Sequence, residues 1–337
     1  MTIRTTLALA VAATLSLATG AFAQADAPQP LATKATVKVG YSSKLTAFAP
    51  LFLAKHFKEF EKENLDVELV VGTPNNSLVL LSTGRLDVGL TQPSAAFFNA
   101  VASGADVKIT APGTFFPDNN KQGLWVSKAF LAGKPYSPAL LKGQTIGSVV
   151  GYGSTISVYI NKELQKAGLT IKDVEFKQMG AADILAALEN GAIPAGILND
   201  PIWLNANPDK VQFAVGQPVT DTGGGWVYGP NLLKDKRDVG MAFMRAIART
   251  TRLYLQGDYM NNKTVSDALV AELETPIEVL KKTPAPLFPA DMQIPPTYLD
   301  TVQTVYSLTP GVLTYTALLP RDKVEDSAFV KPYAGTK

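Results

Sequence analysis

The strongest constraint on the fold is an alternation of short β-branched segments with amphipathic ones. In the first series, strands are predicted at residues 36–41, 66–71, 86–90 and 107–111, and helices at 50–63, 76–83 and 93–102. Strands that alternate with helices favour a mostly parallel sheet covered by helices. The first third of the chain is therefore predicted to form one α/β lobe.

The pattern then starts again. Strands are predicted at 123–126, 144–149, 174–178, 193–198 and 210–215, helices at 154–167 and 181–190, and a helical turn at 200–206. The glycine-rich segment 222–226 suits a hinge or a tight crossover, and a long amphipathic helix follows at 236–256. Two successive series with a glycine-rich return predict an α/β protein of two lobes joined by a hinge, with a cleft between them.

The first 23 residues predict export. Arg4 is their only charge, residues 7–18 are almost wholly apolar, and small residues occupy the two positions of a cleavage site at Ala21 and Ala23. About a dozen apolar residues are too few to cross a bilayer. We expect a cleaved signal peptide, residues 1–23, and a mature protein in the periplasm.

Composition narrows the chemistry further. The 337 residues hold 31 Lys+Arg and 29 Asp+Glu, a balance that gives no electrostatic footprint for nucleic acid. There is no cysteine, which excludes disulfides, thiol catalysis, cysteine metal sites and a lipoprotein anchor. The mature protein is therefore expected to diffuse freely and to depend on a buried core.

Catalytic motifs are missing. His56 is the only histidine and lies among lysines and glutamates, as a surface residue would, and no nucleophile elbow occurs. The segment 151–155 is glycine-rich but lacks the lysine of a phosphate-binding loop. We predict no enzymatic activity, no cofactor and no metal site.

Polar, small residues follow the predicted strands at five places. They are Ser42, Ser43 and Lys44; Asn75, Asn76 and Ser77; Thr91, Gln92 and Ser94; Tyr152, Gly153, Ser154 and Thr155; and Asn199 and Asp200. Each loop alone is explained by helix capping. Ligands bind outside the carboxyl ends of strands in open α/β sheets, so five such loops from two lobes favour a binding cleft.

Aromatic residues accompany these loops, namely Phe48, Phe115, Phe116, Trp125, Tyr152, Trp203, Trp226 and Tyr228. Core packing explains Phe48 and Trp125, whereas Tyr152 and Trp226 lie in glycine-rich segments and are candidates for stacking on a flat ligand. Lys44 is the only cation in the five loops. An anion would then be held by backbone N–H groups and hydroxyls, and Asp200 could accept a hydrogen bond from a ring or amino N–H.

The order of several segments resembles the SsuA/THI5-like (NMT1-type) solute-binding proteins. The matching segments are Val37–Tyr41, Ala49–Lys55, Phe60–Leu69, Gly84–Gly89, Phe98–Ile109, Leu140–Gly147, Gly168–Leu169, Asp173–Val174 and Ala187–Ile193. Together they extend over roughly residues 36–330. Two departures are Pro194, where many relatives carry an acid, and Asp200-Pro201, where Glu-Pro is common.

The resemblance implies a type II periplasmic binding protein, the receptor of an ABC importer, with lobe one at 36–121 and 220–337 and lobe two at 122–219. It places the ligand on the loops above, so the candidate binding residues are Ser42, Ser43, Asn75, Asn76, Ser77, Gln92, Ser94, Tyr152, Gly153, Ser154, Thr155, Asn199, Asp200 and Trp226. Hinges are expected near 111–113 and 220–225. The implied partners are a small-molecule ligand and a permease–ATPase complex, and we expect a monomer.

Relatives import sulfonates, nitrate, taurine, aromatic acids and pyrimidine precursors, so the resemblance does not name the solute. Aromatic and asparagine residues without arginine favour an aromatic or heteroaromatic solute, which can be an anion. The alternatives are an alkanesulfonate, taurine or nitrate receptor, a THI5-like pyrimidine-related enzyme, and a sensory receptor. The enzyme is disfavoured because such relatives rely on histidine and cysteine chemistry.

Overall fold

The computed structural model describes residues 29–335, so the predicted signal peptide lies outside the described residues. The side chains of Pro74 and Asn75 are also outside the description. No helix within 29–335 is long and apolar enough to cross a membrane.

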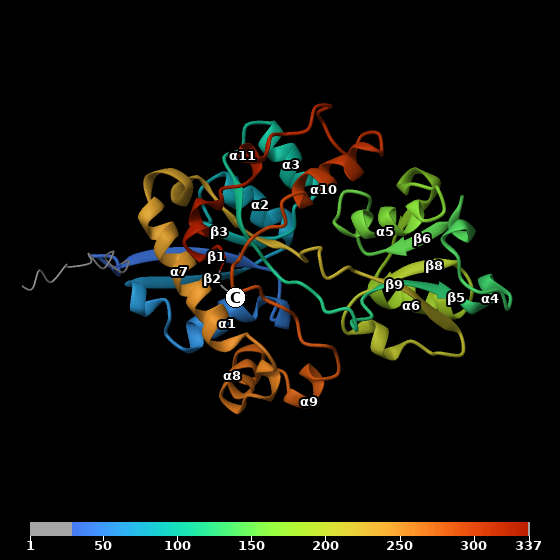
Figure 1. Ribbon diagram of the computed structural model, residues 1–337, viewed down its shortest axis with the longest axis horizontal. Helices are drawn as coiled ribbons and strands as arrows, with labels where there is room; N and C mark the ends of the chain where they lie inside the picture. The colour runs from blue at the N-terminus through green and yellow to red at the C-terminus, as the bar shows by residue number, and fades with distance from the viewer. Residues whose placement is uncertain (1–28, 336–337) are drawn as a thin grey trace, which may run out of the picture.

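Ten strands form two five-stranded sheets, one in each lobe (Figure 1). The sheet of lobe one has the order β2-β1-β3-β10-β4, with β1 Ala35–Tyr41, β2 Leu65–Val71, β3 Val88–Thr91, β4 Lys108–Pro112 and β10 Gly225–Tyr228. The sheet of lobe two has the order β7-β6-β8-β5-β9, with β5 Gly123–Ser127, β6 Thr145–Ser148, β7 Glu175–Gln178, β8 Ala195–Leu198 and β9 Val211–Gly216. The predicted two-lobed α/β fold is confirmed.

The two sheets have the same topology, and each contains one antiparallel strand. Strand β5 lies between β8 and β9, and β10 lies between β3 and β4, antiparallel to both neighbours in each case. The other pairs, β1 with β2 and β3 and β6 with β7 and β8, are parallel. The antiparallel strand of each sheet is the first strand that the chain forms after crossing from the other lobe. The crossing segments are residues 113–122 and 217–224.

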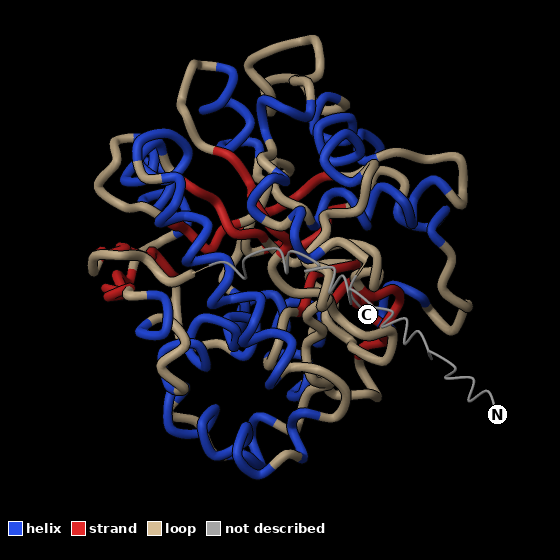
Figure 2. Tube along the Cα trace, turned by 60° about the vertical axis from the view of Figure 1, so that its left-hand side comes forward, coloured by secondary structure: helices blue, strands red, loops and turns tan. Residues whose placement is uncertain are grey.

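Helices cover both sheets (Figures 1 and 2). They are α1 Ala49–His56, α2 Pro74–Ser82, α3 Ala95–Ala102, α4 Lys128–Leu131, α5 Ile156–Gln165, α6 Ala181–Glu189, α7 Arg237–Tyr254, α8 Lys263–Leu273, α9 Ile277–Leu280, α10 Tyr298–Ser307 and α11 Arg321–Val324. In lobe one, α1, α7 and α8 share one core cluster, while α2 and α3 contribute to another.

Helix α1 ends seven residues earlier than the sequence predicts. Lys58 adopts a left-handed conformation with φ 56°, and the amide of Glu59 donates to the carbonyl of Ala54 at 2.8 Å. This closing turn is a Schellman arrangement, which here uses lysine where glycine is usual. A short 3-10 helix, η2 Glu61–Glu63, follows and brings Glu59 and Glu63 beneath α7.

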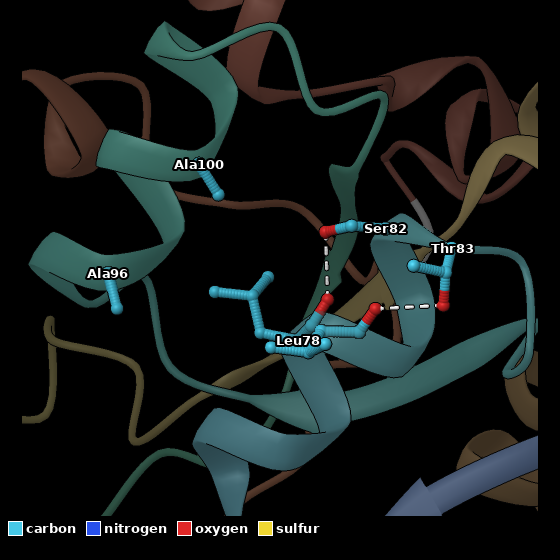
Figure 3. Close-up of a pocket in the computed structure, with 6 residues that line it drawn as sticks. Leu78, Ser82, Thr83, Ala96 and Ala100 are labelled. Carbon is cyan, nitrogen blue, oxygen red and sulfur yellow. Dashed lines mark hydrogen bonds between the residues drawn. The ribbon is translucent and has the colours of Figure 1, made fainter.

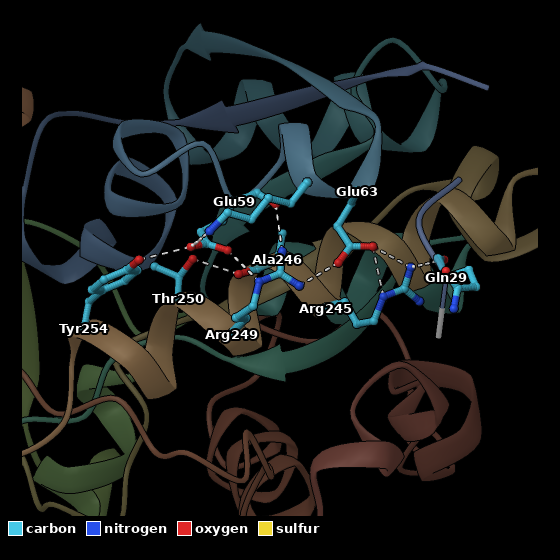
Figure 4. A network of polar contacts seen from close by, with 9 residues as sticks. Gln29, Glu59, Glu63, Arg245, Ala246, Arg249, Thr250 and Tyr254 are labelled. Atoms are coloured by element: carbon cyan, nitrogen blue, oxygen red, sulfur yellow. Dashed lines mark hydrogen bonds and ion pairs between the residues drawn. The ribbon is translucent and has the colours of Figure 1, made fainter. Parts of the chain in front are cut away.

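A buried ionic network joins this turn to α7 (Figure 4). Arg249 donates to Glu59 Oε2 at 2.5 Å and to Glu63 Oε1 at 2.7 Å, and Arg245 donates to Glu63 Oε2 at 2.6 Å. Lys62 and Tyr254 both donate to Glu59 Oε1. Because the two carboxylates are buried, these partners fix the position of α7 on lobe one.

The lobes also touch through the C-terminal part of the chain. Helix α10 packs against α5 of lobe two and against α3 of lobe one, and Figure 1 shows it between them. One core cluster therefore extends through both lobes; it includes Phe97, Phe98, Val158, Ile160, Val302 and Tyr306. The connection between the lobes is more than the two crossing segments.

The hinges predicted near 111–113 and 220–225 need correction only where they overlap strands, because Gly113 and residues 220–224 lie in the crossing segments. Ala111 and Pro112 belong to β4, and Gly225 and Trp226 belong to β10, so these residues are paired within the sheet of lobe one. Strand β10 is short and begins with a glycine. Its extended conformation is fixed by pairing with β3 on one side and β4 on the other. Any hinge must therefore lie inside the crossing segments.

Candidate ligand-binding cleft

The loop after β1 leaves its hydroxyl groups unused. Ser42 is half-buried and Ser43 is exposed, and neither side chain forms a hydrogen bond with the residues described. Lys44, the cation predicted beside them, donates to Glu274, so its charge is already paired. This loop offers two free hydroxyls and a neutralised lysine.

The predicted loop of Asn75, Asn76 and Ser77 is the first turn of α2. Thr73 is the N-cap, and its hydroxyl accepts from the amide of Asn76 at 3.3 Å. Asn76 is exposed, whereas Ser77 is buried and packs near Gly40. The helix is therefore capped by Thr73 and not by any of the three predicted residues.

Two hydrogen bonds at the predicted binding loops join the lobes directly. The Thr155 hydroxyl donates to Gln92 Oε1 at 3.1 Å, and the amide of Ala95, next to Ser94, donates to the Gly153 carbonyl at 2.9 Å. The Ser94 hydroxyl caps α3 by accepting from the amide of Phe97. A Cβ on Gly153 would lie 2.8 Å from the Cβ of Ala95, which explains why glycine suits this contact. We call Gln92, Ser94, Gly153 and Thr155 the interlobe seam.

Tyr152 and Ser154 serve lobe two itself. The Tyr152 hydroxyl donates to the Val174 carbonyl at 2.9 Å and accepts from the Phe176 amide, and its ring meets Phe176 edge to face. The Ser154 hydroxyl donates to the Gly151 carbonyl. The hydroxyl of Tyr152 is fully used in joining this loop to β7.

Asp200 follows β8 and is the candidate with the most distinctive surroundings. Its carboxylate accepts from Asn120 Nδ2 at 3.2 Å and from Trp203 Nε1, and its amide donates to Gln122 Oε1 at 3.3 Å. Each of these three partners is neutral. Burial raises the pKa of Asp200, although the hydrogen bonds from Trp203 and Asn120 act in the opposite direction.

Two of the three neighbours of Asp200 come from a distant segment. Trp203 lies on the 3-10 helix η5 Ile202–Asn205, while Asn120 and Gln122 lie on the first crossing segment. Asn199, beside Asp200, is half-buried. The sequence gives no sign that Asn120 would be buried against Asp200, because the contact joins residues 80 positions apart.

Trp226 is not in a loop, and the prediction of a cleft position for it is wrong. It lies on β10 with a side chain 2 % exposed, and its ring packs against Phe243 of α7 with centroids 5.7 Å apart. Side chains alternate along a strand, so Trp226 and Tyr228 point into the α7 core and Val227 points to the opposite face.

Comparison with known proteins agrees with this architecture. A model of the NMT1/THI5-like family matches residues 45–257, which is more than half of the chain. The chain belongs to the NMT1/THI5-like family. The sequence resemblance is thereby confirmed. No curated protein sequence matches it.

Solved structures share the fold of this NMT1/THI5-like protein. The alkanesulfonate-binding protein SsuA from Xanthomonas axonopodis pv. citri, bound to MOPS, is 19 % identical with a TM-score of 0.58, covering 90 % of this chain and 99 % of its own. The nitrate-binding protein NrtA from Synechocystis PCC 6803 is 15 % identical with a TM-score of 0.65, covering 89 % and 88 %. The desulfurization enzyme DSZB is 12 % identical with a TM-score of 0.55, covering 89 % and 99 %.

A cavity of about 370 Å³ in this NMT1/THI5-like protein lies away from the cleft, between α2 and α3 of lobe one (Figure 3). It is lined by Leu78, Val79, Ser82, Thr83, Ala96 and Ala100. The hydroxyls of Ser82 and Thr83 donate to carbonyls of their own helix, at 2.8 and 3.0 Å. The cavity thus presents an almost wholly apolar wall and none of the predicted binding residues.

Proposed function

We propose that the protein is the periplasmic solute-binding component of an ABC importer, and that it holds a small aromatic or heteroaromatic solute between its lobes for delivery to a permease–ATPase complex. Family membership and the fold shared with SsuA and NrtA support a binding role. The fold is also that of the enzyme DSZB, so the proposal depends on the side chains of the cleft.

The observation that carries the proposal is the Asp200 carboxylate. It lies at the carboxyl end of β8, half-buried, and its partners in the structure are an amide and an indole rather than a cation. A desolvated carboxylate is stabilised by a further donor, and a ring or amino N–H of a heteroaromatic solute is such a group. Ser42 and Ser43 offer hydroxyls from the facing lobe.

Apolar side chains at the strand ends support a flat solute. Leu45 lies just beyond β1, Val71 ends β2 and Val150 lies just beyond β6, and all three are exposed, Val71 by 67 %. Exposed apolar side chains beside polar groups are typical of ligand sites. An aromatic face would remove this surface from water.

An alkanesulfonate, taurine or nitrate is the second candidate, because SsuA and NrtA bind such anions according to their names. The present cleft is less suited to them. Lys44 is paired with Glu274, and the five loops contain no arginine. Backbone N–H groups and hydroxyls would have to hold the anion beside the negative charge of Asp200.

A thermal-shift screen of the purified protein tests the proposal. One panel holds nicotinate, benzoate, cytosine and 4-aminopyrimidine, and the other holds taurine, ethanesulfonate and nitrate. We expect a concentration-dependent rise in Tm with a member of the first panel, since a solute that binds only the folded state stabilises it. Stabilisation by the second panel alone would overturn the aromatic proposal.

The Asp200→Asn variant locates the binding group. It keeps a side-chain oxygen but loses the charge, so we expect affinity for the aromatic solute to fall about tenfold. The matched control is Asp209→Asn, an exposed aspartate of lobe two, which should bind as the wild type does. Equal affinity in both variants would remove Asp200 from the site.

A further inference from the structure

A second carboxylate, Asp221, lies at the junction of the lobes and is used differently from Asp200. It belongs to the crossing segment 217–224, and its side chain is 5 % exposed. Lys162 Nζ on α5 of lobe two donates to Asp221 Oδ1 at 2.7 Å, and the Thr220 hydroxyl donates to the same oxygen at 3.2 Å. The pair joins the body of lobe two to the segment that leads out of it.

The two partners differ in their access to water. Lys162 is 40 % exposed, whereas the other oxygen of Asp221, Oδ2, is buried and accepts no hydrogen bond from residues 29–335. If Lys162 lost this partner, water would solvate its ammonium group without any movement of the backbone. A buried carboxylate that lost its cation would have to reach water by moving its backbone.

The surroundings connect this pair to lobe one. The Tyr298 hydroxyl of α10 donates to the carbonyl of Thr222 at 3.0 Å, and α10 packs on α5. Gln217, at the start of the same segment, donates from Nε2 to the Asp221 carbonyl at 3.0 Å, and its Oε1 accepts from Gln122 Nε2 of the other crossing segment at 3.4 Å. Helix α5, both crossing segments and α10 therefore meet around Asp221.

We propose that the Lys162–Asp221 ion pair is a latch that holds the second crossing segment against α5 and so limits the movement of the lobes relative to each other. Sliding or rotation of α5 away from this segment separates the pair and leaves Asp221 buried without a cation. The pair thus favours the arrangement of lobes seen in Figure 1, whether or not a solute is bound. The inference is independent of the identity of the solute.

The test measures the distance between the lobes in solute-free protein. Because the chain has no cysteine, Ala271→Cys on α8 and Lys210→Cys in lobe two give the only two thiols for spin labels, and both positions are exposed. Double electron–electron resonance then reports the distribution of distances. We expect one narrow distribution in the labelled wild type and a broader, shifted one in Lys162→Met, with the ratio of released to latched molecules raised about tenfold or more.

Because Lys162 is more exposed than Asp221, the variants should differ in how much they broaden the distance distribution. Asp221→Asn should broaden the distribution less than Lys162→Met, because it leaves no buried charge behind. The double variant should return close to the width of Asp221→Asn alone. Should Lys162→Met fail to fold, this double variant and Asp221→Asn still decide the question.

Lys166→Met is the matched control. Lys166 is the C-cap residue of the same helix and pairs with a buried acid of that helix, Glu163, at 2.6 Å, so this ion pair lies wholly within lobe two. Its loss should leave the interlobe distribution unchanged. If Lys162→Met and Lys166→Met give the same distribution, or if Asp221→Asn broadens it more than Lys162→Met, the latch is disproved.

Discussion

Two acidic regions of the molecule differ in the charge of the groups that surround them. Glu59 and Glu63, under α7, are surrounded by Arg245, Arg249 and Lys62 (Figure 4). Among residues 29–335, the carboxylate of Asp200, at the end of β8, accepts hydrogen bonds only from the amide of Asn120 and the indole of Trp203.

This difference in neighbouring charge distinguishes the structural role of Glu59 and Glu63 from the candidate binding role of Asp200. In the first region, burial alone would raise the pKa of Glu59, but hydrogen bonds from Lys62 and Arg249 outweigh it and hold the pKa below its ordinary value. In the second, burial prevails and the pKa of Asp200 is raised. A carboxylate whose charge is not compensated by its own protein is the one that gains from a ligand.

The largest effect is expected from breaking the first region. Arg249→Met removes the cation shared by Glu59 and Glu63 and leaves each carboxylate with one cation, Lys62 or Arg245. The free energy of unfolding should fall by about 3 kcal/mol, the lower end of the cost of breaking a buried ion pair. Urea denaturation measures the change. The control, Lys263→Met, breaks the exposed Lys263–Asp267 pair and should cost under about 0.5 kcal/mol. Similar losses in both variants would show that the network is no more than surface pairing.

Acid should reduce the difference in unfolding free energy between wild type and Arg249→Met. The folded-state pKa of Glu59 is lowered, so its stabilisation is complete above its ordinary value of 4.5 and is lost as pH falls through the lowered pKa. We expect the gap in unfolding free energy between wild type and Arg249→Met to shrink below about pH 4.5. A gap that stays constant down to pH 3 would contradict the assignment of the effect to ionised Glu59.

The smallest effect concerns Asp200 and has the opposite sign. Its pKa is raised, so the ionised form is disfavoured in the folded state, and Asp200→Asn should stabilise the protein at pH 7 by about 0.5 kcal/mol. The gain should disappear as pH falls through the raised pKa, when the wild-type carboxyl becomes neutral. A variant less stable than wild type at pH 7 would mean that Asp200 is part of the scaffold after all.

The sequence predicts the elements that depend on local patterns. The alternation of apolar residues locates β1, β2, α3 and α6 to within a few residues, because side-chain periodicity is a property of the segment itself. The end of α1 was missed because Lys58 carries the left-handed conformation usually given to glycine. Strand β10 was missed because its pairing partners come from residues more than a hundred positions earlier.

The candidate site was predicted less completely. The loops after the strands were located from their polar residues, but whether those residues face a solute or each other depends on contacts between lobes. Thr155 with Gln92 and Asp200 with Asn120 are such contacts. Trp226 was misplaced because its ring is buried by α7, a helix of the same lobe that comes later in the chain.

The position of β10 in the chain, after all the strands of lobe two, has a consequence for the order of assembly. All five strands of lobe two come from one continuous stretch, residues 123–216, whereas lobe one needs β10, which follows that stretch. During synthesis from the N-terminus, the sheet of lobe two therefore has all its strands before the sheet of lobe one does. We expect lobe two to be protected from proteolysis earlier than lobe one when cell-free synthesis of the chain is followed in time, because lobe one must wait for a strand made after lobe two is complete.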